Sequence, residues 1–161
     1  MKSTIVKVVL LGGVVTLMFA CNAKKAETET AVIDKEQIKK EIQDKENEFA
    51  KLYNGAEMKE IGYYAEDATT FYQNKAPLVG KAAIVEFLKS DLNSNFNVIT
   101  FITNEVFPSS DGNQVVEVGS YKVIDSAKSA INTGNYITLF EKRNGKYESV
   151  REMSASDIPI Q

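Results

Sequence analysis

The 161-residue chain contains no histidine and only one cysteine, Cys21. Without an imidazole, neither a Ser-His-Asp triad nor a Cys-His pair can be assembled, so nucleophilic catalysis of these two kinds is excluded. The same absence disfavours a zinc or iron site, because imidazole is the usual protein ligand of transition metals. A single cysteine cannot form an intramolecular disulfide. We therefore expect neither a metal nor a cofactor.

Basic side chains are also scarce: 19 lysines and arginines stand against 22 aspartates and glutamates, for a net charge of −3. No stretch concentrates lysine and arginine among aromatic residues, as a nucleic-acid groove requires. Nucleic acid is therefore not an expected partner. The remaining composition, 43% hydrophobic and 25% charged, is that of an ordinary globular protein, and the length suits one domain with one core.

The N-terminus has the pattern of a targeting segment. Two lysines supply positive charge, and residues 8–20 form an uncharged, apolar run that is too short to be a good membrane span. The run ends in LMFAC, where the small Ala20 precedes Cys21. This resembles the lipobox of bacterial lipoproteins, in which cleavage before the cysteine leaves a thiol to be lipidated. The alternative is an ordinary secretory signal with an incidental cysteine.

If the lipobox is real, residues 1–20 are removed and Cys21 carries the lipid that holds the protein on a membrane. The expected location is then the bacterial cell envelope, with the protein facing the periplasm or the cell surface. Residues 21–33 are small, polar and charged, which indicates a flexible tether between the lipid and a domain formed by residues 34–161.

The first half of this domain has helical periodicity. Apolar residues at helical spacing predict a helix capped by Asp34 that ends near Gly55. Two further helices are expected over residues 57–64 and 81–92. Between them, the segments ATTFY and PLV read as two short strands.

Beyond Asn95 the pattern changes to four long strands, separated by turn signals. The strongest of these signals is Asn144-Gly145, because both residues of such a two-residue turn take positive φ. Helices followed by an antiparallel meander predict an α+β fold in which helices cover one face of the sheet.

The Asn144-Gly145 turn also predicts a register for the last hairpin, in which Leu139 faces Val150 and Ile137 faces Glu152. Alternation then sorts the hairpin into two faces. One face carries Asn135, Ile137, Leu139, Glu141, Glu148, Val150, Glu152 and Ser154, and the other carries Tyr136, Thr138, Phe140, Lys142, Tyr147, Ser149, Arg151 and Met153. Neither face is purely polar, which suggests that helices cover one and a second subunit covers the other.

The segments YYAEDATTFY, PLVGKAAIVEFL and GNYITLFEKRNGKYESVREMSASD, behind a helix ending in FAKLYNG, resemble the SnoaL-like, domain-of-unknown-function branch of the nuclear transport factor 2-like superfamily. The resemblance spans residues 36–157. It implies a cone: a strongly bent antiparallel sheet of four long and two short strands, wrapped around three N-terminal helices, with a pocket on the concave face. It also implies a homodimer through the outer sheet face and a concave position for Glu152. We therefore orient the Asn135, Glu152 and Ser154 face inward.

Ketosteroid isomerase is the best-understood enzyme with this fold. The resemblance aligns its catalytic base with Tyr72, its oxyanion tyrosine with Phe49, and its second oxyanion acid with Asn135 or Ile137. Enolisation requires a carboxylate base and a preorganised donor, and neither stands at these positions. Steroid isomerase chemistry is therefore not expected. Dehydratase and polyketide-cyclase relatives pair a histidine with an aspartate, and this chain has no histidine.

Glu152 is the sharpest candidate for chemistry. An acid on an inward strand position beside apolar neighbours is desolvated, and desolvation gives it a raised pKa suited to acid-base work. The alternative is a carboxylate in water or one paired with a lysine. The expected ligand-binding residues are Phe49, Tyr72, Asn135, Glu152 and Ser154.

Three hypotheses follow from these patterns. The favoured one is a binding module, a lipid-anchored protein whose pocket holds a small, largely apolar molecule without catalysis. The second is a lyase, isomerase or hydrolase that uses Glu152 together with a pocket tyrosine. The third is an oligomerising domain that serves protein partners, and it predicts a pocket plugged by side chains.

Overall fold

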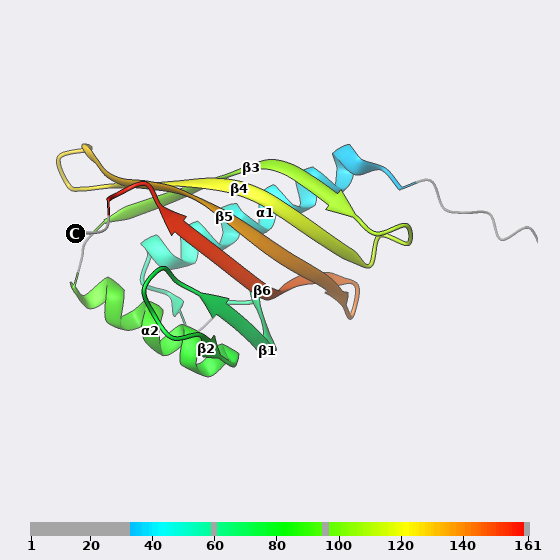
Figure 1. Cartoon of the computed structure of the whole chain (residues 1–161), viewed down its shortest axis with the longest axis horizontal. Coiled ribbons are helices and arrows are strands. Elements are labelled where there is room, and N and C mark those ends of the chain that lie inside the picture. The colour runs from blue at the N-terminus through cyan, green and yellow to red at the C-terminus, as the bar shows by residue number, and fades with distance from the viewer. Residues whose placement is uncertain (1–32, 59–60, 95–96, 160–161) are drawn as a thin grey trace, which may run out of the picture.

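The computed structural model describes residues 33–58, 61–94 and 97–159 (Figure 1). The predicted signal segment 1–20, the lipidation site Cys21 and all but the last residue of the predicted tether lie outside these ranges. The elements are, in chain order, α1 (Lys35–Asn54), β1 (Tyr64–Phe71), β2 (Leu78–Val79), α2 (Lys81–Ser94), β3 (Val98–Pro108), β4 (Gln114–Ile124), β5 (Ala130–Arg143) and β6 (Lys146–Ser156). None of the helices in these ranges is sufficiently long and apolar to cross a membrane.

The six strands form one curved sheet in the order β2-β1-β6-β5-β4-β3. Strands β3 to β6 pair as the predicted antiparallel meander, and β1 pairs with β2 antiparallel. The predicted all-antiparallel sheet is wrong at one place, because β1 and β6 run parallel. Both helices lie on the same side of the sheet, with α1 along β3 and α2 beside β1 and β2 (Figure 1). The α+β cone predicted from the sequence is therefore confirmed.

Helix α1 begins where the sequence predicts. The Asp34 side chain accepts a hydrogen bond from the backbone N–H of Gln37 at 2.9 Å, which satisfies one of the free donors of the first turn. The helix ends as the backbone N–H of Gly55 bonds the carbonyl of Lys51. Its buried stripe contains the expected apolar residues and one acid, Glu46, that the periodicity did not single out.

The predicted helix over residues 57–64 is wrong in its second half. Ile61 and Gly62 belong to no helix or strand, and Tyr64 already begins β1. Glycine weakens a helix, and Tyr63 and Tyr64 gain more by packing in the core, where both rings contact Phe49. The described part of the chain therefore contains two long helices where the sequence predicted three helices. The helix expected over 81–92 is present as α2.

The last hairpin contains a β-bulge that the predicted register did not include. Next to the turn, Arg143 faces Lys146 as expected, and the pairing continues to Phe140 opposite Ser149. The following pair is Leu139 opposite Arg151, so Val150 has no partner across the ladder. Such an extra residue shifts all later pairs by one position and redirects the side chains beyond it.

The bulge corrects the two predicted faces. On β5 the alternate residues Tyr136, Thr138 and Phe140 are buried, whereas Asn135 and Ile137 are exposed on the outer face. The inward orientation predicted for Asn135 and Ile137 is therefore wrong. Their expected partners on β6 are also wrong, because Asn135 faces Ala155 and Ile137 faces Met153.

Candidate functional site

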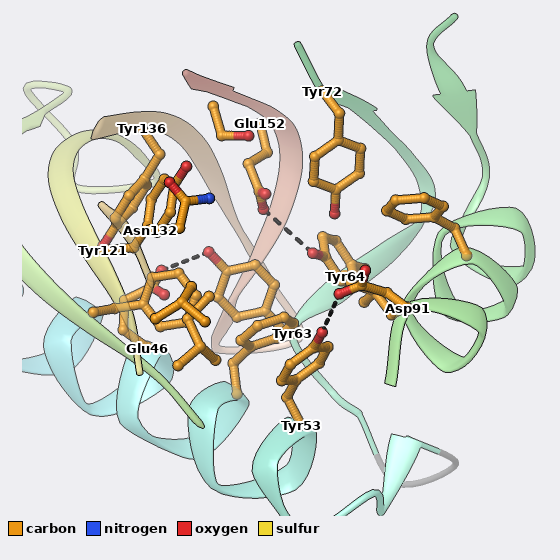
Figure 2. A pocket seen from close by; sticks show the side chains of 17 residues that line it. Glu46, Tyr53, Tyr63, Tyr64, Tyr72, Asp91, Tyr121, Asn132, Tyr136 and Glu152 are labelled. Atoms are coloured by element: carbon orange, nitrogen blue, oxygen red, sulfur yellow. Dashed lines mark hydrogen bonds between the residues drawn. The ribbon is translucent and has the colours of Figure 1, made fainter. Parts of the chain in front are cut away.

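A cavity of about 250 Å³ lies between the concave face of the sheet and the two helices (Figure 2). Its wall is mostly aromatic, with six tyrosines and three phenylalanines. The polar and charged residues that line it are Glu46, Asp91, Asn132, Glu152 and Ser154. No lysine or arginine contributes to this lining within the described ranges. The pocket therefore combines an apolar, ring-rich interior with carboxyl groups and no basic counterpart.

Glu152 projects from β6 into this cavity (Figure 2). Among the hydrogen bonds found for the described residues, it accepts one, from the Tyr64 hydroxyl at 3.4 Å. Burial raises the pKa of the Glu152 carboxyl to about 7, against the opposing effect of the Tyr64 hydrogen bond; the nearby Glu117 raises it further. At neutral pH a substantial fraction of this carboxyl is therefore protonated and the rest is ionised.

Several tyrosine hydroxyls surround Glu152 or the rim of the cavity. Tyr64 is almost fully buried, and burial together with the charge of Glu152 raises its pKa. Tyr72 follows β1, and its ring lies 4.9 Å from that of Phe87 on α2. Tyr53 on α1 donates a hydrogen bond to Asp91 on α2 at 2.5 Å (Figure 2). These rings and hydroxyls hold the two helices and the sheet around one space.

A second pair of acids, Glu46 and Glu117, is more deeply buried, and of the two Glu46 lines the pocket. Glu46 on α1 is 1% exposed and Glu117 on β4 is 0% exposed. The Tyr63 hydroxyl donates to Glu46 at 2.5 Å, while Thr103 and Tyr136 donate to the same oxygen of Glu117 at 2.6 and 3.0 Å. No salt bridge in the described part of the chain involves either carboxyl.

Both of these carboxyls have raised pKa values. Burial is the largest cause for each, and the charge of Glu117 adds to the shift of Glu46. An ionised carboxylate without a basic partner is costly in such surroundings, so the pair retains protons at pH values where exposed glutamates are ionised. Retained protons make the pair a source of O–H donors as well as acceptors.

Four of the five predicted ligand-binding residues, Phe49, Tyr72, Glu152 and Ser154, line the cavity, and Asn135 does not. Asn135 is exposed on the outer face, and the pocket amide comes from Asn132 instead. Glu152 and Ser154 face inward because the bulge at Val150 moves them there, not because of the regular register assumed from the sequence.

Glu46 and Glu117 were missed from the sequence, although each carried a signal. Glu46 follows Ile42 by four residues and precedes Phe49 by three, which places it on the apolar stripe of α1. Glu117 alternates with Val115 and Gly119 on β4, so it shares their inward face. An acidic residue at a position where the helix or strand repeat predicts a buried apolar side chain is the pattern that would have identified both glutamates.

The donor set limits the chemistry of the site. Within residues 33–58, 61–94 and 97–159, no group of three or more acidic or cysteine side chains is arranged to hold a metal ion. The site offers carboxyl groups with raised pKa values and tyrosine hydroxyls, which can bind a ligand or exchange protons with it.

Comparison with solved structures places the fold. A protein of unknown function with a cystatin-like fold from Nostoc punctiforme is 12% identical, with a TM-score of 0.65, covering 76% of this chain and 92% of that one. A nuclear transport factor 2-like protein of unknown function from Shewanella oneidensis is 16% identical, with a TM-score of 0.61 and coverages of 71% and 96%. This chain has the nuclear transport factor 2-like fold.

A ketosteroid isomerase-like protein from Erwinia carotovora shares the fold at 13% identity, with a TM-score of 0.60, covering 74% of this chain and 96% of that one. No sequence-family model matches the chain, and no curated protein matches it either. The nuclear transport factor 2-like fold supports many unrelated activities, so its function here has to be argued from the pocket.

Proposed function

We propose that the protein binds a small, largely apolar molecule in the cavity on the concave face of its sheet. The observation that carries this proposal is that the cavity is open: about 250 Å³ remains between aromatic side chains that could have filled it. An apolar cavity of roughly 150 Å³ accommodates benzene. The space here therefore suits a molecule with one ring and a short substituent, with Glu152 as its polar anchor.

Native mass spectrometry of the protein from its own cells tests this proposal, because it reports any retained small molecule. The matched variants are Ser154→Trp, which fills the cavity from β6, and Ser110→Trp, which adds the same ring at an exposed turn. We expect the retained mass to vanish only with Ser154→Trp. An unchanged retained mass in both variants would place the ligand elsewhere and refute the proposal.

A catalytic role is the second candidate, and one observation favours it. The pKa of Glu152 is raised to about 7 inside the pocket, which suits a general acid or base at neutral pH. The hydroxyls of Tyr64 and Tyr72 would then supply hydrogen bonds to the reacting molecule. The test is to incubate the retained molecule with protein and follow its mass. Wild-type protein should convert the molecule and Glu152→Gln should not. Conversion by Glu152→Gln at an unchanged rate would exclude Glu152 as the acid or base, and no conversion by the wild type would leave only the binding role.

We also propose that two copies associate through the outer face of the sheet. Four large apolar side chains on β3, β5 and β6 are more than half exposed: Ile102 60%, Phe107 51%, Ile137 52% and Met153 59%. Ile137 and Met153 are direct neighbours across β5 and β6. A twofold axis lets one such patch cover itself. Ile137→Lys should convert dimer to monomer in sedimentation velocity, whereas a protein that is monomeric before substitution contradicts the proposal.

The sequence pattern at Cys21 supports a proposal for location, a lipid anchor in the bacterial cell envelope. Metabolic labelling with a radioactive fatty acid should mark the wild-type protein and leave Cys21→Ser unlabelled. The same substitution should move the protein from the membrane fraction to the soluble fraction. Labelling that survives the substitution would exclude Cys21 as the attachment site.

A further inference from the structure

The charge of the pocket lining has one sign. Glu46, Asp91 and Glu152 are the ionisable acids that line it, and the lining among described residues contains no lysine or arginine. The Lys75 ammonium lies 5.0 Å from the centre of the Phe87 ring, which lines the cavity, but Lys75 itself does not line it. A ligand carboxylate or phosphate would therefore find no basic side chain in the lining, and its charge would remain uncompensated.

The aromatic wall fits the opposite charge. Ring faces carry a negative quadrupole, and several rings around one space attract an ammonium group more strongly than water-exposed rings do. Phe49 on α1 contacts the rings of Tyr63, Tyr64 and Phe101 at centroid distances of 4.9, 6.0 and 5.5 Å, so the rings form a continuous wall. The neighbouring Tyr72 and Phe87 extend it toward α2.

Glu152 lies within this wall and is incompletely satisfied. The single hydrogen bond it accepts among the described residues is long, at 3.4 Å, and comes from a neutral phenol. Acidic or phenolic groups face it from every surrounding element: Glu46 from α1, Tyr64 and Tyr72 from β1 and its end, Asp91 from α2, Glu117 from β4 and Tyr136 from β5. No group on this list can supply positive charge, so a cationic partner for the ionised form of Glu152 would have to come from a ligand.

We infer that the ligand of the proposed pocket is a small organic cation, with an ammonium group against the Glu152 carboxylate and an apolar body against the tyrosine and phenylalanine rings. This inference rests on the proposed binding function and adds the chemical class of the ligand. A cavity of about 250 Å³ limits that body to the size of one ring with a short chain. Primary arylalkylamines meet these requirements of charge, shape and size.

The test compares two molecules that differ in charge and little in shape. The probes are 2-phenylethylamine, an ammonium ion at neutral pH, and 2-phenylethanol, its uncharged counterpart. Binding of each to the whole chain is measured by isothermal titration calorimetry at pH 5.5 and pH 8.5. The amine remains protonated over this range, because alkylammonium groups lose their proton near pH 10.4.

The amine should bind at least tenfold more tightly than the alcohol at pH 8.5. The affinity for the amine should rise about thirtyfold from pH 5.5 to pH 8.5. The cation needs the ionised carboxyl, and the pKa of Glu152 in the unliganded protein is about 7. Glu152→Gln should abolish the preference for the amine and its pH dependence. The matched control Glu105→Gln removes the same charge from an exposed position on β3 and should retain the preference.

The remaining outcomes distinguish a pocket that does not prefer cations from a pocket that does not bind ring-sized molecules. Equal or tighter binding of the alcohol, or an amine affinity that falls with rising pH, overturns the cation inference while leaving the binding pocket supported. Retention of the amine preference in Glu152→Gln also overturns it. If neither probe binds at millimolar concentration, a pocket for ring-sized molecules is refuted together with the inference.

Discussion

Replacing Glu152 with glutamine should stabilise the protein at pH 8 and leave its stability at pH 5 much less changed. The folded-state pKa of Glu152 is raised from 4.5 to about 7, chiefly by burial. The folded protein therefore binds a proton more tightly than the unfolded chain does. This contribution to stability is fully present below pH 4.5 and is lost as the pH rises through 7.

The size of the effect follows from the shift. Each pKa unit corresponds to about 1.4 kcal/mol, so the wild-type protein loses about 3 kcal/mol between pH 4.5 and pH 8 through this one group. Glutamine has nearly the same shape and carries no proton that titrates. At pH 8 it avoids the cost of holding an ionised carboxyl among Tyr64 and its aromatic neighbours. We expect a gain of about 1–3 kcal/mol at pH 8, the lower value allowing for water in the cavity.

Urea unfolding followed by circular dichroism at pH 5 and pH 8 measures this difference. The comparison of variant and wild type reports Glu152 together with its effect on Glu46, whose pKa the Glu152 charge raises, and it cancels the remaining protonation changes that occur in both proteins. Glu105→Gln, at an exposed position on β3, should show no comparable pH-dependent gain. A stability difference between wild type and Glu152→Gln that is the same at both pH values would refute a desolvated Glu152. A loss of stability at pH 8 would refute it as well.

Two further predictions concern packing around the same pocket. Gly119→Ala places a Cβ atom about 2.1 Å from Cζ of Tyr136, so the ring must move from Glu117. We expect the free energy of unfolding in urea to fall by about 1–3 kcal/mol. The control Gly62→Ala, whose added Cβ has no atom within 4 Å, should cost far less. Phe140→Ala empties a fully buried position in the core; it should cost about 3–5 kcal/mol in the same measurement, and a cost below 1 kcal/mol would contradict the packing described here.

Much of the fold could be predicted because several local signals agree with the final packing. Asp34 caps α1, the apolar period of α1 faces the core, and Asn144-Gly145 forms the turn between β5 and β6. The segment from Ile61 to Tyr64 was harder to predict. Its local pattern permits a helix, but Tyr63 and Tyr64 are drawn into the aromatic core by contacts with Phe49, which lies on α1.

The pocket could be predicted only in part, for two physical reasons. The side chains of a regular hairpin alternate between its two faces without interruption. Nothing in the sequence around Val150 marks it as the residue without a partner on β5. For this reason Asn135 was assigned to the wrong face. The buried acids Glu46 and Glu117 were overlooked because polar residues on a helix or strand are ordinarily solvated, and their burial depends on Tyr63, Thr103 and Tyr136 arriving from other elements.

The unpaired Val150 has a consequence for how such a pocket can evolve. A substitution changes one side chain of the wall, but regular pairing of Val150 with Leu139 would turn Glu152 toward the outside and bring Arg151 and Met153 to the concave side. A basic and an apolar side chain would then take the place of Glu152 in the wall without any change of sequence. Two relatives with the same residues at these positions, one with the bulge and one without it, could thus prefer ligands of different charge, and a sequence alignment would not reveal the difference.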